Sequence, residues 1–261
     1  SALDNDILFV ATDLGIYKSI NGGDNWYLHS PQKISGFQFL DSVEVWGTGS
    51  TDYAELLHST DGGITWTDIV SVNNPSPYGV YEAVDFMDSQ TGWIVGNSFT
   101  QGFKNFILNT TDGGQTWDEQ YSTVLPQLKN LCFVDSDYGW AIGEDGIILH
   151  TTDSGVSWNV QPSGSNLDLG AISFVNRNKG WIVGGGFTNN GLEGIILHTF
   201  NGGQTWINQT PFQSPKFYGV SFVDSLTGWV VGGGGSVQDY GVILRTTTGG
   251  QTWEIQRQHV D

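Results

Sequence analysis

Acidic and amide side chains recur at regular intervals in this chain. Acidic side chains can act as general acids or bases, and both kinds can bind metal ions. They occur in six eight-residue segments, called boxes here, of the form Ser/Thr-x-Asp/Asn-x-Gly-x-Thr/Ser/Asn-Trp. Their third positions hold Asn21, Asp61, Asp112, Asp153, Asn201 and, in the sixth box, Thr248. A catalytic residue repeated in every copy of a structural unit cannot converge on one substrate, and a threonine has no acid chemistry. We therefore interpret these residues as turn formers that accept backbone N–H bonds.

Histidines offer a second possibility, a metal site. His58, His150 and His198 each directly precede a box. Zinc needs all its ligands at ~2.0–2.3 Å, whereas a repeat holds its copies apart. The sequence contains no His-Glu-x-x-His segment and no Cys/His cluster. We interpret these histidines as polar residues at strand ends.

Acids in a second group of turns are loosely similar to those of calcium loops. These turns begin at Asp88, Asp135 and Asp224, and none has the twelve-residue loop ending in glutamate of a dedicated calcium site. Nucleophile and phosphate-binding motifs such as Gly-x-Ser-x-Gly and the P-loop are absent from the sequence. The sequence predicts no metal, no cofactor and no catalytic residue in these motifs.

Tryptophan positions define the elements that carry all these residues. One set closes the boxes, at intervals of 40 to 51 residues: Trp26, Trp66, Trp117, Trp158, Trp206 and Trp253. A second set follows segments such as Phe-Val-Asp-Ser-Leu-Thr-Gly: Trp46, Trp93, Trp140, Trp181 and Trp229. This interval is typical of a propeller blade.

The copy at residues 169–210 shows the predicted unit. Four short β-branched runs, called A to D here, are separated by Gly/Asn/Asp turns without helical periodicity. The sequence thus predicts a single all-β domain over residues 1–261. We expect a β-propeller of four-stranded antiparallel blades, with boundaries near residues 31, 71, 122, 163 and 211. Six blades are expected, the first lacking strand A, and a longer natural chain would allow seven.

Composition limits the classes of partner. The 27 acidic residues against 9 basic ones give a net charge of −18, which argues against nucleic acid and anionic membrane. No apolar run approaches the ~18 residues of a membrane span. The start at Ser1 suggests a mature or excised piece of a longer protein, and we expect it to be secreted, at the cell surface or periplasmic. Cys132 is the single cysteine and forms no internal disulfide.

The lengths of the connections between strands point to one candidate binding face. Only the B-to-C and D-to-A connections vary in length, and both emerge on the same face of a propeller. We therefore expect the function on that face. The longer connections are residues 47–55, 97–105, 185–194, 234–241, 71–83 and 210–219. Their aromatic side chains, which suit a protein or a glycan partner, are Tyr53, Tyr78, Tyr81, Phe99, Phe103, Phe187, Phe217, Tyr218 and Tyr240.

One acid departs from the repeat. Asp85 occupies a strand-A position filled elsewhere by Gln38, Cys132, Ser173 and Ser221. An acid there is expected near the central channel, either as a hydrated residue or, with Glu82, as a carboxylate pair for glycoside hydrolysis. Glu144 and Asp145 are weaker acid candidates.

The boxes resemble the Asp-box (BNR) repeat. Their alternation with Phe-x-Asp-x-x-x-Gly-Trp-x-Val-Gly most closely resembles the Ycf48-like photosystem II assembly and stability factor family, over essentially the whole chain. The resemblance implies a propeller, but Asp-box propellers include both glycosidases and non-catalytic scaffolds. The photosystem factors are associated with an arginine-rich patch and sialidases with an arginine triad. The three arginines here, Arg177, Arg245 and Arg257, match neither pattern, which argues against both roles.

These observations favour a non-enzymatic extracellular or periplasmic propeller. It is expected to bind a protein through the variable face, or through an open edge of the first blade that another chain completes as a strand. The alternative is a glycan-binding module or a glycoside hydrolase of the Asp-box type.

Overall fold

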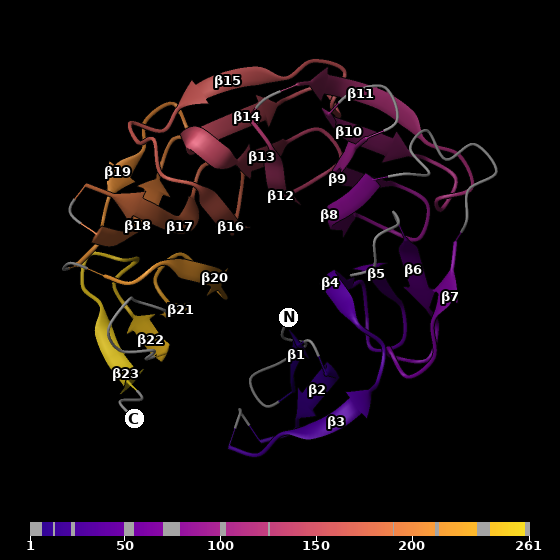
Figure 1. Cartoon of the computed structure of the whole chain (residues 1–261), viewed down its shortest axis with the longest axis horizontal. Helices are drawn as coiled ribbons and strands as arrows, with labels where there is room; N and C mark the ends of the chain where they lie inside the picture. Colours follow the sequence, from indigo (N-terminus) through magenta and orange to yellow (C-terminus); the bar gives the residue numbers. More distant parts are fainter. Residues whose placement is uncertain are drawn as a thin grey trace. The chain divides into compact units, whose positions relative to one another are not determined.

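The computed structural model describes residues 7–12, 14–21, 24–49, 55–69, 79–99, 103–124, 126–189, 191–211, 214–233 and 241–258. The chain forms two compact units, Ser1–Leu125 and Pro126–Asp261. Each unit contains three antiparallel sheets in which consecutive strands lie side by side, as Figure 1 shows for β16 to β19. Each sheet therefore has the topology of a propeller blade. The predicted all-β propeller fold is confirmed.

The first unit holds blades 1 to 3. Blade 1 consists of β1 (Leu8–Thr12), β2 (Gly15–Ser19) and β3 (Tyr27–Ser30). Blade 2 consists of β4 (Ile34–Phe39), β5 (Val45–Gly49), β6 (Leu56–Ser59) and β7 (Thr67–Asp68). Blade 3 consists of β8 (Gly79–Phe86), β9 (Gly92–Ser98), β10 (Lys104–Thr110) and β11 (Asp118–Thr123).

The second unit holds blades 4 to 6. Blade 4 consists of β12 (Leu128–Phe133), β13 (Gly139–Gly143), β14 (Ile147–Thr151) and β15 (Asn159–Pro162), with the short 3-10 turn η1 (Glu144–Gly146) between β13 and β14. Blade 5 consists of β16 (Leu169–Phe174), β17 (Gly180–Thr188), β18 (Gly191–Thr199) and β19 (Ile207–Asn208). Blade 6 consists of β20 (Phe217–Phe222), β21 (Gly228–Gly233), β22 (Gly241–Thr246) and β23 (Glu254–Gln258).

Three strands of blade 1 are described, and their register shows which positions of the blade they fill. Phe9 in β1 is paired with Lys18 in β2, as Trp46 of strand B is paired with His58 of strand C in blade 2. The described strands of blade 1 are therefore B, C and D, and Phe9 replaces the strand-B tryptophan. Among the described residues, blade 1 therefore lacks strand A, as predicted.

Two details of the predicted organisation differ from the structure. The boundary expected near residue 122 falls inside β11, because this strand continues to Thr123. Strands extend into two of the expected loops, 97–105 and 185–194. Asn97 and Asn105 are paired across β9 and β10, and the β17–β18 hairpin continues as far as Thr188 and Gly191. Glycine and polar residues thus extend these ladders where we expected irregular connections.

Alternating apolar residues of the strands form the core between neighbouring blades. In the second unit, Trp140 and Ile142 of blade 4 pack with Ile182 and Leu197 of blade 5. Trp140 and Trp181 are completely buried. At ~25 cal/mol per Å², each buried tryptophan contributes a gross stabilisation of roughly 4–6 kcal/mol, as an upper bound. Among the described residues, no helix is long and apolar enough to span a membrane.

Candidate functional site

The third residue of each box organises its own turn. In the third box, Asp112 Oδ1 accepts the Thr116 backbone N–H at 2.9 Å, and Asp112 Oδ2 accepts the Thr116 hydroxyl at 2.7 Å. The Thr110 hydroxyl donates to Asp112 Oδ1 at 2.8 Å and accepts the Gly114 N–H at 2.9 Å. The two glycines of this box have φ of 70° and 81°, which a side chain would strain.

The same bonds recur in the other boxes. Asp61, Asp153 and Asn201 each accept the N–H of the residue four positions later, and Thr248 in the sixth box does so with its hydroxyl. The Thr65 side chain and backbone lower the pKa of Asp61 to about 2. An ionised carboxylate with these donors has no proton to give. The interpretation of the box residues as turn formers agrees with this geometry.

The boxes of blades 5 and 6 also contact the blade before them. The indole N–H of Trp140 in blade 4 donates to the carbonyl of Gly202 in the box of blade 5, at 3.3 Å. Trp181 in blade 5 donates in the same way to Gly249 in the box of blade 6, at 3.2 Å. The box glycines therefore join adjacent blades as well as closing their own hairpins.

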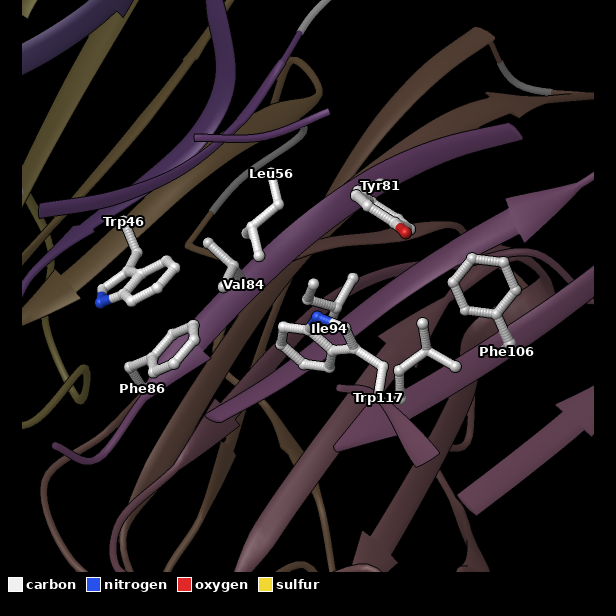
Figure 2. Close-up of a cluster of buried hydrophobic side chains, with 9 residues drawn as sticks. Trp46, Leu56, Tyr81, Val84, Phe86, Ile94, Phe106 and Trp117 are labelled. Carbon is white, nitrogen blue, oxygen red and sulfur yellow. The ribbon is translucent and has the colours of Figure 1, made fainter. Parts of the chain in front are cut away.

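The histidines that precede three of the boxes stack on tryptophan. The Trp46 indole stacks with His58 of its own blade and with Phe86 of the next, at centroid distances of 4.1 and 4.0 Å. Figure 2 shows Phe86 beside Trp46 in this cluster. His150 stacks on Trp140, whose indole also contacts the next blade's phenylalanine.

These stacks give His150 and His198 a structural role within their own blades. Burial lowers the pKa of both His150 and His198, which favours the neutral imidazole. Each ring is held within its own blade against its own tryptophan. Among the described residues, no group of three or more His, Cys, Asp or Glu side chains is placed to hold a metal ion.

The acids proposed for glycoside hydrolysis have structural contacts. Asp85 is buried, with 8% exposure, so the expectation of a hydrated channel residue is wrong. Its Oδ1 accepts the Gln38 amide, and Gln38 also contacts the Phe86 backbone, so this position joins the A strands of blades 2 and 3. Glu82 accepts an amide hydrogen bond from Asn97 at 3.3 Å.

Other acids also act in turns or ion pairs. The backbone N–H groups of Gln90 and Thr91 lower the pKa of Asp88. Asp135 pairs with Arg177 of the next blade. Glu144 lies 3.5 Å from the Lys129 ammonium, and Asp145 has a left-handed φ of 55° in η1. None of these arrangements is a pair of carboxylates facing a common substrate.

The predicted aromatic face divides into buried and exposed members. Tyr81 and Phe217 belong to the hydrophobic core, because their strand positions point toward a neighbouring blade, and they are removed from the predicted face. Phe99 is exposed, and its ring lies 5.8 Å from that of Phe103. The remaining predicted residues Tyr53, Tyr78 and Tyr240 lie outside the described residues.

In the second unit, two exposed aromatic residues belong to connections that contact each other. Phe187, on the β17–β18 hairpin, is 80% exposed, and Tyr218, at the start of β20, is 60% exposed. The Lys216 ammonium lies 5.9 Å from the Tyr218 ring centroid. The hairpin contacts the segment before β20, since the Gly194 N–H donates to the Ser214 carbonyl at 2.8 Å. B-to-C and D-to-A connections therefore do share a side here, as predicted.

Sequence reasoning missed the stacks of histidine, tryptophan and phenylalanine. A signal was present, because Phe86, Phe174 and Phe222 each precede a strand-B tryptophan at the same interval along the chain. The tryptophans alone predict the repeated core, and nothing in a single copy assigns a role to these phenylalanines. Their role depends on the neighbouring blade, which no single copy of the repeat reveals.

Comparison with known proteins places the chain in a family. The family model described as photosynthesis system II assembly factor YCF48 matches residues 71–168 and 128–213, which together cover more than half of the chain. No curated protein sequence matches this chain.

Solved structures show the same fold. A YCF48 bound to D1 peptide has a TM-score of 0.64 at 18% identity, over 98% of this chain and 80% of that one. YCF48 from Cyanidioschyzon merolae has a TM-score of 0.55 at 15% identity, over 88% of this chain and 87% of that one. The GH74 xyloglucanase from Xanthomonas campestris has a TM-score of 0.65 at 14% identity, over 97% of this chain but 43% of the enzyme. The box repeats, the blade topology and the family model together show that the chain belongs to the Ycf48 family of BNR-repeat β-propellers.

Proposed function

We propose that this chain is a non-enzymatic propeller that binds a partner protein through an extended peptide segment. The observation that carries the proposal is the similarity, over 98% of the chain, to a family member bound to a peptide. The contacts of the acids support the non-enzymatic part. The box aspartates, Asp85 and Glu82 all accept hydrogen bonds from the protein itself.

Phe187 and Tyr218 are the residues we propose for the contact. Aromatic side chains such as tyrosine are enriched among the few residues that carry most of the binding energy in protein interfaces. The net charge of −18 favours a neutral or basic peptide over an acidic one, because like charges slow the encounter. We therefore propose a segment without net negative charge.

Selection from a display library of short random peptides tests this function. Selected peptides are expected to be neutral or basic and to bind with an affinity that falls at least ~tenfold in the Phe187→Ala, Tyr218→Ala double variant. Leu226→Ala is the matched control, since Leu226 is an exposed apolar residue in a turn of blade 6. Failure to select any peptide would contradict the function, and equal loss in both variants would contradict the proposed contact.

Glycoside hydrolysis is the alternative, and the similarity to the GH74 enzyme supports only the fold. A panel of chromogenic glycosides is expected to show no turnover above background. Turnover that disappears in both Glu82→Gln and Asp85→Asn would replace our proposal with a glycosidase. Action outside the cytoplasm stays a prediction from the sequence.

A further inference from the structure

The β17–β18 hairpin of blade 5 extends beyond the strands on either side of it. Its residues are paired as far as Thr188 and Gly191. On one side, β16 pairs with β17 only as far as Gly184, and on the other, β19 pairs with only two residues of β18. The end of the hairpin, residues 185–188 and 191–194, therefore has no neighbouring strand in its own sheet among the described residues.

The register shows where the backbone groups of this end point. Gly185 and Gly194 lie opposite each other, and the N–H of each donates away from the hairpin, to the carbonyls of Asp168 and Ser214 at 2.9 and 2.8 Å. In an antiparallel ladder every second pair has this orientation. Phe187, two residues after Gly185, therefore directs its own N–H and C=O toward the outer edge of β17.

The outer edge of β17 carries no strand at Phe187. The connection between blades 4 and 5, residues 163–168, is described in full and reaches this edge at Asp168. Before Asp168 the connection lies against the turn of blade 4, where the Ser165 carbonyl packs on Gly146. Within the described part of the chain, no backbone hydrogen bond joins this connection to Phe187. All of these residues belong to the unit Pro126–Asp261.

The Phe187 edge offers both a donor and an acceptor, which another extended backbone matches with the same two groups. Blade 3 shows the completed arrangement within one chain. Its longer strand A, β8, pairs Gly79 with Ser98 at the end of β9, and Ser98 also pairs with Lys104 of β10. In blade 5, strand A begins only at Leu169. An extended segment of another molecule would take the corresponding place.

The surroundings of this edge select the side chains of such a segment. Phe187 is 80% exposed, and a strand residue directly opposite it places its side chain on the same face, so an apolar residue suits that position. The residues on either side point to the other face, where Leu167 lies beside Gly186. Two acids border that side, since Asp168 Oδ1 accepts the Asp145 N–H at 3.4 Å. Lysine or arginine therefore suits the positions next to the apolar residue.

A second copy of this chain matches the edge less well than a basic segment does. Pairing two β17 edges would bring Asp145 and Asp168 of both copies to one place, and each copy has a net charge of −18. Like charges across an interface oppose association.

We propose that the edge of β17 at Phe187 binds an extended basic segment of a partner protein as an added antiparallel strand. The segment places an apolar side chain beside Phe187 and lysine or arginine beside Asp145 and Asp168. This inference rests on the proposed function and specifies how the backbone of the peptide is bound and which side chains it carries.

A fluorescein-labelled peptide, Gly-Lys-Val-Lys-Val-Lys-Val-Gly, tests the backbone pairing, because its valines and lysines alternate between the two faces of a strand. Fluorescence anisotropy is expected to show saturable binding. With valine opposite Phe187, the valine N–H groups face the edge and the lysine N–H groups point away. N-methylation of the valines is thus expected to weaken binding at least ~tenfold by removing these donors. The peptide N-methylated at its lysines is the matched control and should bind like the unmodified one.

Variants of the protein locate the edge. Phe187→Pro removes the N–H donor and the ring, and it is expected to weaken binding at least ~tenfold. Leu192→Pro is the matched control, because Leu192 lies opposite Phe187 and directs its N–H to the other edge of the same hairpin. Asp168→Asn should weaken binding by about threefold, as loss of a surface charge pair does. Near-UV circular dichroism checks that each variant is folded.

The N-methylated peptides act on the wild-type protein, so they keep the test valid if a proline variant unfolds. Absence of binding, equal binding of the two N-methylated peptides, or equal loss in folded Phe187→Pro and Leu192→Pro would overturn the inference. A wild-type dimer that Phe187→Pro converts to a monomer would also overturn it, since a second copy would then occupy the edge. A library-selected peptide that depends on the Phe187 ring but tolerates N-methylation at every residue would overturn it while leaving the proposed function intact.

Discussion

The phenyl ring of Phe222 lies flat against the indole of Trp181, with centroids 3.4 Å apart and planes 4° from parallel. The two residues belong to different blades, and Phe222 also meets Trp253 of its own blade edge to face, with centroids 6.1 Å apart. One phenylalanine thus connects a core tryptophan of blade 5 with the box tryptophan of blade 6. Its contribution to stability should therefore exceed that of an ordinary strand residue.

Replacement of Phe222 by alanine is expected to lower the free energy of unfolding by about 3–5 kcal/mol, because it leaves a cavity between two indoles. Urea unfolding followed by circular dichroism measures the change. Phe200→Ala is the control: this ring is about half exposed in a box turn, and its loss should cost little. Equal destabilisation by the two variants would contradict the structural role of the stack.

The Thr110 hydroxyl should matter more than its methyl group. Thr110→Val keeps the shape but leaves the buried Gly114 N–H without its acceptor, which is expected to cost about 1–3 kcal/mol. Thr110→Ser retains the hydroxyl, as Ser59 does in the second box, and should be closer to the wild type. Thermal unfolding ranks the variants, and a valine variant as stable as the serine variant would argue against this hydrogen bond.

Ser154 has a left-handed φ of 61° at a box position where Gly113 and Gly202 stand in other boxes. Ser154→Gly is expected to stabilise the fold by up to about 1 kcal/mol, since it relieves the side-chain strain of that conformation. Gly113→Ser is the reciprocal change and should destabilise, because its Cβ would lie 2.9 Å from the Ser89 carbonyl. A shift of both variants in the same direction would contradict the role assigned to backbone conformation.

Stability should decline as the pH falls below about 6.5. Burial lowers the pKa of His150 and His198, so the unfolded chain binds protons on these residues at a pH where the folded chain does not. The destabilisation by these two histidines is therefore absent above the pKa that histidine has in the unfolded chain. It grows as the pH falls through that value. Urea midpoints measured across this range test the sign. The His150→Gln, His198→Gln double variant should flatten the slope, and an unchanged slope would exclude these histidines as its source.

A further loss is expected in stronger acid. The pKa of Asp61, at about 2, lies below its ordinary value of 3.8, so the folded state is favoured by the ionised carboxylate. This contribution is present above pH 3.8 and disappears as the pH approaches 2. Asp61→Asn should show a smaller loss over that interval in the same unfolding measurements, since the amide oxygen still accepts backbone bonds, as Asn201 does.

The fold was accessible from the sequence because its signals are local. In a box such as residues 110–117, the side chain that stabilises the turn and the backbone group that it bonds lie in the same eight residues. Asp112 and Trp117 could therefore be given structural roles from one copy of the repeat. Tyr81 and Phe217 were misassigned because the direction of a strand residue depends on register, which loop composition does not reveal.

The bonds from Trp140 to Gly202 and from Trp181 to Gly249 have a consequence for how such chains change in length. Blade 5 presents the indole donor of Trp181 to its successor and the carbonyl of Gly202 to its predecessor. A whole copy duplicated between blades 4 and 5 or between blades 5 and 6 would meet complementary partners on both sides without any compensating mutation. Gain of complete repeats is thus structurally simple, whereas loss of half a repeat separates a donor from its acceptor.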